Sequence, residues 1–451
     1  MNRRQTLSLC MIVRNEEHVI EDCLRSVAGI VDQIVVVDTG STDTTIDICK
    51  KFGAEVYRFR WVDDFSKARN ESIKYAKGDW ILWMDADERL DPGSINELKK
   101  LLKYEKIPVA YKVSIKNFKA DGSFYFSDAH RLFNNNRGIS FYGPIHEQVS
   151  PSIIAMKGEL RNSNVLIVHL GYSYKGERAE KKRERNKKLL LKYVEKDPKN
   201  AYAHYTLGQF YGLNGEYEKA VRHYRVALKY CNFDKPLTCS LYNCMAEALI
   251  NIKDYKSAEI FVRKSLETIP EQVYGNYLYY RISHESGNHQ ECITHLENLL
   301  RANEYIKKYG KRISADGVID DEKITFSLLS CSFNAENYDI FNKYSSVYIS
   351  SFDDTKGLKY IYNMSVKAKD YTFAVKILEK LYKSEKNIKY LEDMAILYIK
   401  LQKFQEAITV YEKLIMYNPE NVEYYKKIAG LYAKIGQKDR AIAILSKLNI
   451  M

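Results

Sequence analysis

The chain has 451 residues, of which 45% are hydrophobic, and this is enough for two domains with ordinary cores. Its net charge of +12 would suit nucleic acid, but no nucleic-acid-binding module is evident, so nucleic acid is not an expected partner. No run of about 18 apolar residues is present, and the eight cysteines include no C-x-x-C pair, so we expect a cytoplasmic chain without a membrane span or zinc.

Apolar strand patterns and amphipathic helix patterns alternate over the first ninety residues. The predicted strands are 6–13, 33–37, 54–60 and 80–84, and the predicted helices between them are 15–28, 44–52 and 65–77. Asn15 is expected to cap the first helix. The apolar run of the first strand is too short for a signal peptide. This alternation predicts an α/β domain whose mostly parallel sheet is covered by helices.

Two carboxylates, Asp85 and Asp87, follow directly after the apolar strand 80–84. Open α/β sheets bind ligands at the carboxyl ends of their strands, which is where this pair is expected to lie. Alternate residues of an extended chain point the same way, so both carboxylates are expected to face one cation. Hard oxygen ligands suit Mg²⁺ or Mn²⁺, and such a cation normally binds substrate phosphates as well.

The first predicted strand is not followed by a glycine-rich loop. The residues after it are Arg14, Asn15 and Glu16, whereas a dinucleotide-binding fold needs G-x-G-x-x-G at this point. No P-loop pattern occurs in the sequence either. These observations argue against a dehydrogenase.

Three blocks of this region have an order and spacing that resemble a known enzyme family. They are IVVVDTGSTDTT, DDFSKARN and GDWILWMDADE. Together they resemble the family 2 glycosyltransferases of the GT-A fold, over about residues 5–175. The resemblance implies a metal-dependent nucleotide-sugar glycosyltransferase of the EC 2.4 class. Such an enzyme moves a sugar from a UDP-sugar with inversion and uses a divalent cation, Mn²⁺ or Mg²⁺.

The resemblance also implies roles for individual residues. The implied nucleotide-sugar-binding residues are Asp38, Arg69, Asp85, Arg14 and Asp64, and the implied metal ligands are Asp87, Asp85 and His169. Plainer interpretations stay open for three of them. Asp38 could belong only to a turn, Arg69 could pair with Asp63 or Asp64 on the surface, and His169 could be an ordinary core residue.

A general base is expected beyond the metal motif, because deprotonating an acceptor needs a carboxylate or imidazole near the anomeric carbon. By resemblance, the His-Glu pair at 146–147 makes Glu147 the leading candidate, with Asp128 as the alternative. Glu147 could instead be a surface residue at a strand edge. Around these residues we expect a helix at 98–103, strands at 109–117 and 165–172, and a hairpin at Asp121–Gly122.

A strongly basic segment follows the last of these strands. Residues 175–192 carry nine Lys or Arg residues, which predicts a helix with a charged, solvated face. Arg185 and Lys188 are the candidates in it to reach the diphosphate of the donor.

From about residue 197 the sequence resembles tetratricopeptide repeats. The alanine that anchors each repeat is expected at 220, 258, 374, 407 and 441, and a cysteine takes its place at 292. The steps from 258 to 292 and from 407 to 441 are each 34 residues, the length of this repeat. We expect about six repeats, with a degenerate one near Tyr338 and an irregular segment at 302–322.

The predicted divisions are a GT-A domain at 1–175, a basic connecting helix at 176–196 and an all-α repeat solenoid at 197–451. This arrangement resembles the S- and O-glycosyltransferases of glycosylated bacteriocin biosynthesis. The resemblance implies transfer to a Ser or Thr hydroxyl, or a Cys thiol, of a peptide or protein held by the repeats. The repeats could also form a homodimer. Two other functions stay open: transfer to a cell-surface saccharide or lipid-linked acceptor, and a repeat scaffold with an inactive transferase domain.

Overall fold

The structure is a computed structural model, and it describes residues 4–118, 124–135, 137–170, 177–309, 313 and 316–448. The hairpin expected at Asp121–Gly122 lies outside these residues. The chain divides into two compact units. The first unit is Met1–Ile282 with Arg301–Val318, and the second unit is Ser283–Leu300 with Ile319–Met451.

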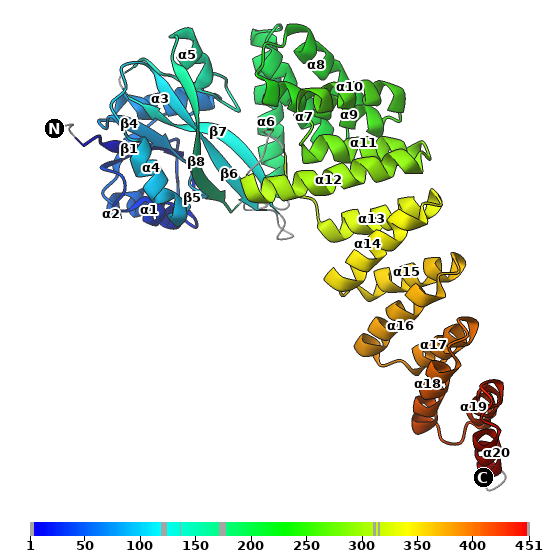
Figure 1. The fold of residues 1–451 in the computed structure, drawn as a ribbon. Coiled ribbons are helices and arrows are strands. Elements are labelled where there is room, and N and C mark those ends of the chain that lie inside the picture. The colour runs from blue at the N-terminus through cyan, green and yellow to red at the C-terminus, as the bar shows by residue number, and fades with distance from the viewer. Residues whose placement is uncertain are drawn as a thin grey trace. The chain divides into compact units, whose positions relative to one another are not determined.

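The first unit begins with an eight-stranded mixed sheet of strand order β3-β2-β1-β4-β7-β6-β8-β5 (Figure 1). The strands are β1 (Leu7–Val13), β2 (Gln33–Asp38), β3 (Glu55–Arg58), β4 (Trp80–Trp83), β5 (Glu88–Leu90), β6 (Val109–Phe118), β7 (Phe124–Asn134) and β8 (Glu159–His169). β1 is parallel to both β2 and β4, β3 is parallel to β2, and β8 is parallel to β6. β7 is antiparallel to β4 and β6, and β5 is antiparallel to β8. Parallel pairs are the majority, so the expected fold class is confirmed.

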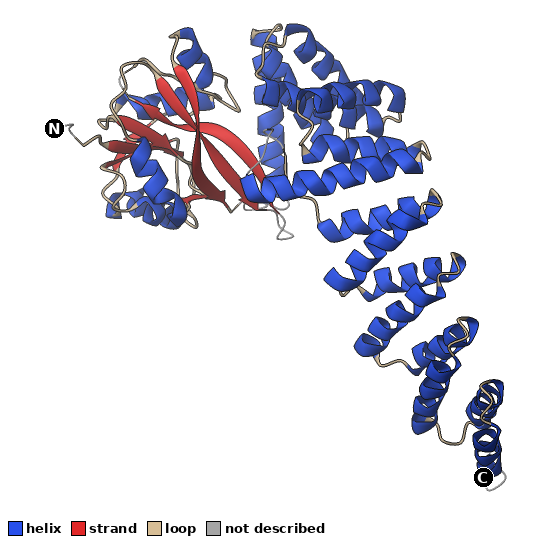
Figure 2. Ribbon diagram, viewed as in Figure 1, coloured by secondary structure: helices blue, strands red, loops and turns tan. Residues whose placement is uncertain are grey.

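Helices cover both faces of this sheet (Figure 2). Because alternate residues of a strand point to opposite faces, the residues of β1 are buried in two different cores. Leu7 and Leu9 pack with apolar residues of the helices on one face, and Cys10 packs with Ile153 on the other. The helices of this part are α1 (Ile20–Val27), α2 (Thr45–Lys51), α3 (Phe65–Lys74), η1 (Pro92–Ser94), α4 (Ile95–Leu101) and α5 (Ser150–Ala155). This packing leaves the carboxyl ends of β1, β2 and β4 at one edge of the sheet.

Two local expectations differ from the structure. Asn15 does not cap α1: the position before the helix is Val19, which makes no side-chain cap. Instead, Asn15 has a φ of 57° and its Oδ1 accepts a hydrogen bond from the Thr42 N–H at 2.8 Å. The sequence also did not indicate β5, because a strand of three residues is too short to show an alternating pattern.

The basic helix α6 (Glu177–Lys196) belongs to the same compact unit as the sheet and the first repeats. Leu189 and Leu190 of α6 are buried in one core with Ile145 and with apolar residues of the first repeats. The structural boundary at 282 therefore lies well beyond residue 197, where the character of the sequence changes.

Seven helix pairs follow in the described part of the chain. They are α7 (Ala201–Leu213) with α8 (Tyr217–Tyr230), α9 (Lys235–Asn251) with α10 (Tyr255–Thr268), α11 (Val273–Glu285) with α12 (His289–Tyr309), α13 (Asp321–Asn334) with α14 (Tyr338–Ser351), α15 (Thr355–Lys367) with α16 (Tyr371–Glu385), α17 (Ile388–Lys400) with α18 (Phe404–Tyr417), and α19 (Val422–Lys434) with α20 (Lys438–Leu448). None of the helices so described has both the length and the apolar composition that crossing a membrane requires.

The predicted anchor residues are buried in these pairs. Ala220, Ala258, Cys292, Ala374 and Ala407 are each 0% exposed, and Ala441 is 7% exposed. The degenerate repeat expected near Tyr338 is the pair α13–α14, and Phe341 occupies its anchor position, 33 residues before Ala374. With this repeat and the six anchors named above, the described helix pairs number seven, one more than the expected count of about six. The segment expected to be irregular begins as helix, since α12 continues to Tyr309.

Candidate active site

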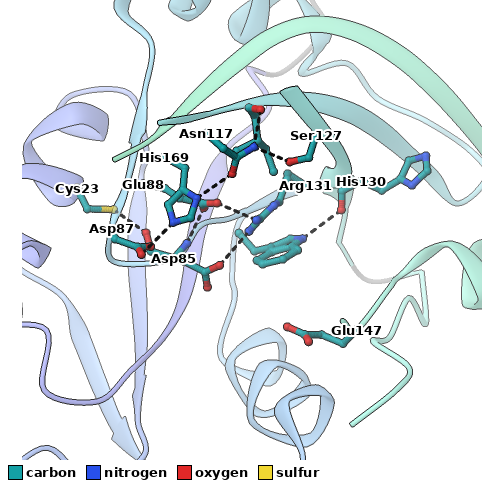
Figure 3. Close-up of polar contacts among 12 residues, drawn as sticks. Cys23, Asp85, Asp87, Glu88, Asn117, Ser127, His130, Arg131, Glu147 and His169 are labelled. Atoms are coloured by element: carbon teal, nitrogen blue, oxygen red, sulfur yellow. Dashed lines mark hydrogen bonds and ion pairs between the residues drawn. The ribbon is translucent and has the colours of Figure 1, made fainter. Parts of the chain in front are cut away.

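The site forms where β4 ends and the chain turns. The Glu88 N–H donates to the Asp85 carbonyl at 3.1 Å, and the Asp85 N–H donates to Glu88 Oε2 at 2.8 Å. The expectation that Asp85 and Asp87 share one face of an extended strand is therefore wrong, because residues 85–88 form a turn. The two carboxylates have different partners (Figure 3).

Asp87 faces His169 at the end of β8. Asp87 Oδ2 is 3.0 Å from His169 Nε2, and His169 Nδ1 is 2.8 Å from Asn117 Oδ1 (Figure 3). The Asn117 amide is oriented by its Nδ2, which donates to the Ile115 carbonyl at 3.0 Å and to Ser127 Oγ at 2.9 Å. Asn117 Oδ1 therefore accepts from His169 Nδ1–H, and this directs His169 Nε2 toward Asp87.

Asp87 and His169 fit a divalent cation. An imidazole with its proton on Nδ1 presents the lone pair of Nε2, and the carboxylate oxygen beside it is a second acceptor. Two acceptors this close need a proton or a cation between them, and the hydrogen bond to Asp87 accordingly raises the pKa of His169. Carboxylate oxygen suits Mn²⁺ or Mg²⁺, and an imidazole beside it favours the transition metal of the two.

Arg69 joins two of the predicted site residues. It is 6% exposed, its Nη2 donates to Asp85 Oδ1 at 2.7 Å, and its Nε donates to Glu147 Oε1. Its guanidinium carbon lies 3.9 Å from the centre of the Trp83 ring. Arg69 thus holds Asp85 and Glu147 together rather than pairing with Asp63 or Asp64, and its contact with a nucleotide stays a prediction.

A second buried arginine, Arg131 of β7, was not among the predicted site residues. Its Nη2 donates to Glu88 Oε1 at 2.8 Å, and its Nη1 lies 3.7 Å from Asp85 Oδ2 (Figure 3). Its guanidinium carbon is 3.3 Å from the centre of the Trp83 ring, so Trp83 contacts both arginines. The sequence signal that could have indicated Arg131 is its position as a charged residue directly before Leu132 and Phe133 in an apolar strand.

The carboxylates of the site differ in their affinity for protons. Desolvation alone would raise the pKa of Asp85, but Arg69 and Arg131 outweigh it and hold this pKa at about 2. Burial raises the pKa of Glu88 to about 7 against the charge of Arg131. Glu16, which the sequence did not single out, has a pKa raised to about 7 by burial and by the neighbouring carboxylates. Several carboxylates in one place are an environment that a cation would stabilise.

Two of the predicted nucleotide-binding residues have local roles in the structure, and a third is exposed. Asp38 is 4% exposed, and its oxygens accept from the Gly40 N–H at 3.2 Å and the Ser41 N–H at 2.9 Å, as in a turn. Asp64 caps α3 by accepting a backbone N–H at 3.1 Å. Arg14 is exposed directly after β1. Their contacts with a nucleotide stay predictions.

The two candidate bases lie in different surroundings. Glu147 has a side chain that is 7% exposed, and it is joined to Asp85 through Arg69. Asp128 lies on β7 and accepts from Ser114 Oγ of the neighbouring β6 at 3.1 Å. The interpretation of Glu147 as a residue on the surface is therefore wrong, while its role as a base stays a prediction.

Helix α6 contacts the loop before α3. Lys188 Nζ is 3.5 Å from Asp63 Oδ2, and the Arg185 guanidinium lies 5.2 Å from the centre of the Phe65 ring. Lys182 is close enough to Glu16 to lower its pKa, although burial and the other carboxylates outweigh this effect. Lys182 is therefore a positive charge near the site, in addition to the predicted Arg185 and Lys188.

Comparisons with known proteins agree with this architecture. Residues 8–156 match the sequence profile of Glycosyl transferase family 2, and residues 189–222 and 398–450 match profiles of the tetratricopeptide repeat. Over 229 residues the chain is 36% identical to a TPR repeat-containing protein of Synechococcus elongatus, which covers 49% of this chain and 56% of that protein. Over 221 residues it is 30% identical to the SPbeta prophage-derived glycosyltransferase SunS of Bacillus subtilis, which covers 48% of this chain and 51% of that protein. The chain thus matches about half the length of each of these relatives.

Proposed function

This chain joins a family 2 glycosyltransferase domain to tetratricopeptide repeats, and on that premise we propose that it transfers a sugar from a UDP-sugar to a peptide or protein side chain. The observation that carries the proposal is the hydrogen-bonded chain Asn117–His169–Asp87 beside Asp85. It supplies a carboxylate and an oriented imidazole at the carboxyl end of β4, where this family binds its donor.

Asp87 and His169 are the residues that would hold a divalent cation. When bound, the cation supplies positive charge against the negative charge that develops on the departing nucleoside diphosphate. Asn117 fixes the imidazole tautomer through its hydrogen bond of 2.8 Å. Asp85 keeps its charge because of Arg69 and Arg131, and this supports its role as an acceptor for hydroxyl groups of the donor.

Glu147 is the proposed acceptor of the proton from the incoming hydroxyl or thiol. Arg69 binds its Oε1, which orients the carboxylate and leaves Oε2 as the atom that would take the proton. Arg69 thereby links the base to Asp85 on the donor side of the site. Because Asp85 and Glu147 bind the same guanidinium, Arg69 also sets the distance between these two carboxylates.

A polypeptide acceptor is supported by how closely the first repeat approaches Glu147. Ile145 packs in the core of the first repeats, and Tyr202 of α7 lies near Gln148 and within electrostatic range of Glu147. The loop that carries the proposed base is therefore packed against the first repeat. A segment bound along the repeats of the first unit could reach Glu147 without crossing to another part of the molecule.

The experiment is transfer assayed by mass spectrometry. The purified chain is incubated with Mn²⁺, a panel of UDP-sugars and synthetic peptides encoded by neighbouring genes. We expect one peptide to gain the mass of a hexose or N-acetylhexosamine, and Asp87→Asn to prevent this. Modification only of a saccharide or lipid-linked acceptor would contradict the proposed acceptor, and no transfer or donor hydrolysis with any sugar would contradict the proposed activity.

A further inference from the structure

A second cluster of metal-ligating side chains lies in the second unit, among the repeats. It consists of His289 at the start of α12, Cys292 one turn later and Cys331 in α13. One ligand atom from each residue lies within 4.8 Å of the other two. None of the three residues belongs to the site around Asp87.

The spacing of these residues suits a common ligand. Residues three apart on a helix project from the same face, so His289 and Cys292 both point toward Cys331. Zinc bonds of about 2.3 Å to sulfur and about 2.0 Å to nitrogen put the ligand atoms of a tetrahedral site roughly 3.5–3.8 Å apart. Since the ligand atoms lie within 4.8 Å of one another, a contraction of at most about 1 Å reaches that geometry, and side-chain rotation can supply it.

The histidine provides an independent indication that something binds here. Nδ1 of His289 is buried and has no hydrogen-bond partner among the described residues. A buried polar atom without a partner is costly, and such exceptions call for an explanation such as a missing ion. The two sulfur ligands beside it are also shielded from solvent, since Cys292 is 0% and Cys331 is 2% exposed.

The repeat pattern points to the same position. Cys292 occupies the anchor position that is alanine in the repeats centred on Ala220, Ala258, Ala374 and Ala407. The small anchor packs against the neighbouring helix, so a thiol there adds a ligand where the repeat needs only a methyl group. Cys331 follows 39 residues later, so the sequence shows no C-x-x-C pair and did not indicate zinc.

We propose that His289, Cys292 and Cys331 bind one Zn²⁺, with a water molecule in the fourth position. The two thiols lose their protons to solvent on binding, and the neutral imidazole contributes Nδ1, so two protons are released for each ion bound. The metal joins α12 to α13 and stabilises the second unit. Thiolate and imidazole ligands distinguish this site from the carboxylate-containing site at Asp87.

The test uses the full chain, purified without a polyhistidine tag. We expect one zinc per chain by elemental mass spectrometry, and we expect Co²⁺ substitution to give a thiolate-to-cobalt charge-transfer band. Cys331→Ala and His289→Asn should each lower the zinc content at least tenfold and abolish or shift that band. The matched control is Cys239→Ala, which removes another buried thiol from α9, and Asp87→Asn controls for the other metal site.

Three outcomes would overturn the proposal. Zinc retained in both Cys331→Ala and His289→Asn would place the ion elsewhere. Zinc absent from the wild type, with two fewer titratable thiols than the eight cysteines of the sequence, would indicate a disulfide instead. Zinc absent with all eight thiols present would mean that Cys292 and Cys331 are only small core residues.

Discussion

The transferase site and the repeat array bury very different groups. Around Asp85 the buried side chains are charged and linked, with Arg69, Arg131 and Glu88 all at or below 6% exposure. At six of the seven repeat anchors they are small, five alanines and Cys292, and in a solenoid each repeat contacts mainly its neighbours. The first region therefore depends on contacts between segments far apart in the sequence, whereas the second depends on a local period. A single substitution should have far-reaching chemical effects in the first and local effects in the second.

The largest effect is expected from Glu147→Gln. If this side chain takes the acceptor proton, the turnover number for a hydroxyl acceptor should fall by about 10²–10⁴-fold, with little change in donor affinity. A thiol acceptor should lose less, because a cysteine pKa of about 8.5 leaves some thiolate near neutral pH. Initial rates with matched Ser and Cys peptides test this, and unchanged activity toward the Ser peptide would move the role to Asp128 or elsewhere.

Asp87→Asn should have the next largest effect. Removing a residue that hydrogen-bonds to a metal ligand typically lowers metal affinity or activity by about 10–100-fold. Removing the ligand itself should therefore lower kcat/KM by about 100-fold or more. EDTA should abolish the transferase activity of the wild type and barely change the residual activity of the variant. Calorimetry should show that UDP binds the wild type more tightly with Mn²⁺ than without it. Equal affinity with and without Mn²⁺ would rule out a metal that binds through the diphosphate.

The same contrast explains how much could be predicted from the sequence. The alternating strands and helices from β1 to β4 and the anchor alanines follow from local patterns, and the structure contains them, whereas β5, β7 and α5 were not predicted. The pairing of Arg131 with Glu88 could not be predicted, because β7 and the turn after β4 meet only through the sheet register. The turn at 85–88 was also missed, since Asp-x-Asp after a strand is equally compatible with an extended chain.

A middle-sized effect is expected from Asn117→Leu, which removes the acceptor that orients His169. We expect Mn²⁺ affinity to fall by about 10–100-fold while the fold is kept. The pH dependence should also change. The pKa of His169 is raised by Asp87, so in the wild type a proton competes with the metal, and Mn²⁺ binding weakens as pH falls through that pKa. Mn²⁺ titrations at several pH values test the orienting role. The control variant is Asn117→Asp, whose carboxylate can still accept a hydrogen bond from His169. Equal Mn²⁺ affinity in the Leu variant would contradict it.

A smaller and local effect is expected from Ala407→Leu in the second unit. Overfilling this anchor should reduce the free energy of unfolding by about 1–3 kcal/mol, because Ala407 is 0% exposed. Ala433→Leu, on the exposed face of α19, is the matched control and should be nearly neutral. Urea unfolding measures both. Donor hydrolysis by the transferase domain should be unchanged at temperatures where the repeats stay folded, and a loss of hydrolysis there would show long-range coupling.

The smallest effect on donor chemistry is expected from removing the last four helix pairs, α13 to α20, which make up most of the second unit. A chain cut after Val318 keeps α12 and the Asp316 side chain, which accepts the Val273 N–H at 3.0 Å and the Tyr274 N–H at 2.8 Å. It should bind UDP-sugar and hydrolyse it slowly with wild-type constants, and any loss should appear as a raised acceptor KM, since the lost contacts would bind ground and transition states equally.

A cut after Lys196 is the informative comparison, because the sequence alone would place the boundary there. That cut removes the repeat helices which cover Ile145 and Leu190, and exposing this apolar surface should make the fragment aggregate. If the shorter fragment is instead soluble and modifies acceptor with the full-length KM, the first repeats neither support the loop of Glu147 nor hold the acceptor. Dimerisation through the repeats would then be their remaining role, and sedimentation of the full chain would test it.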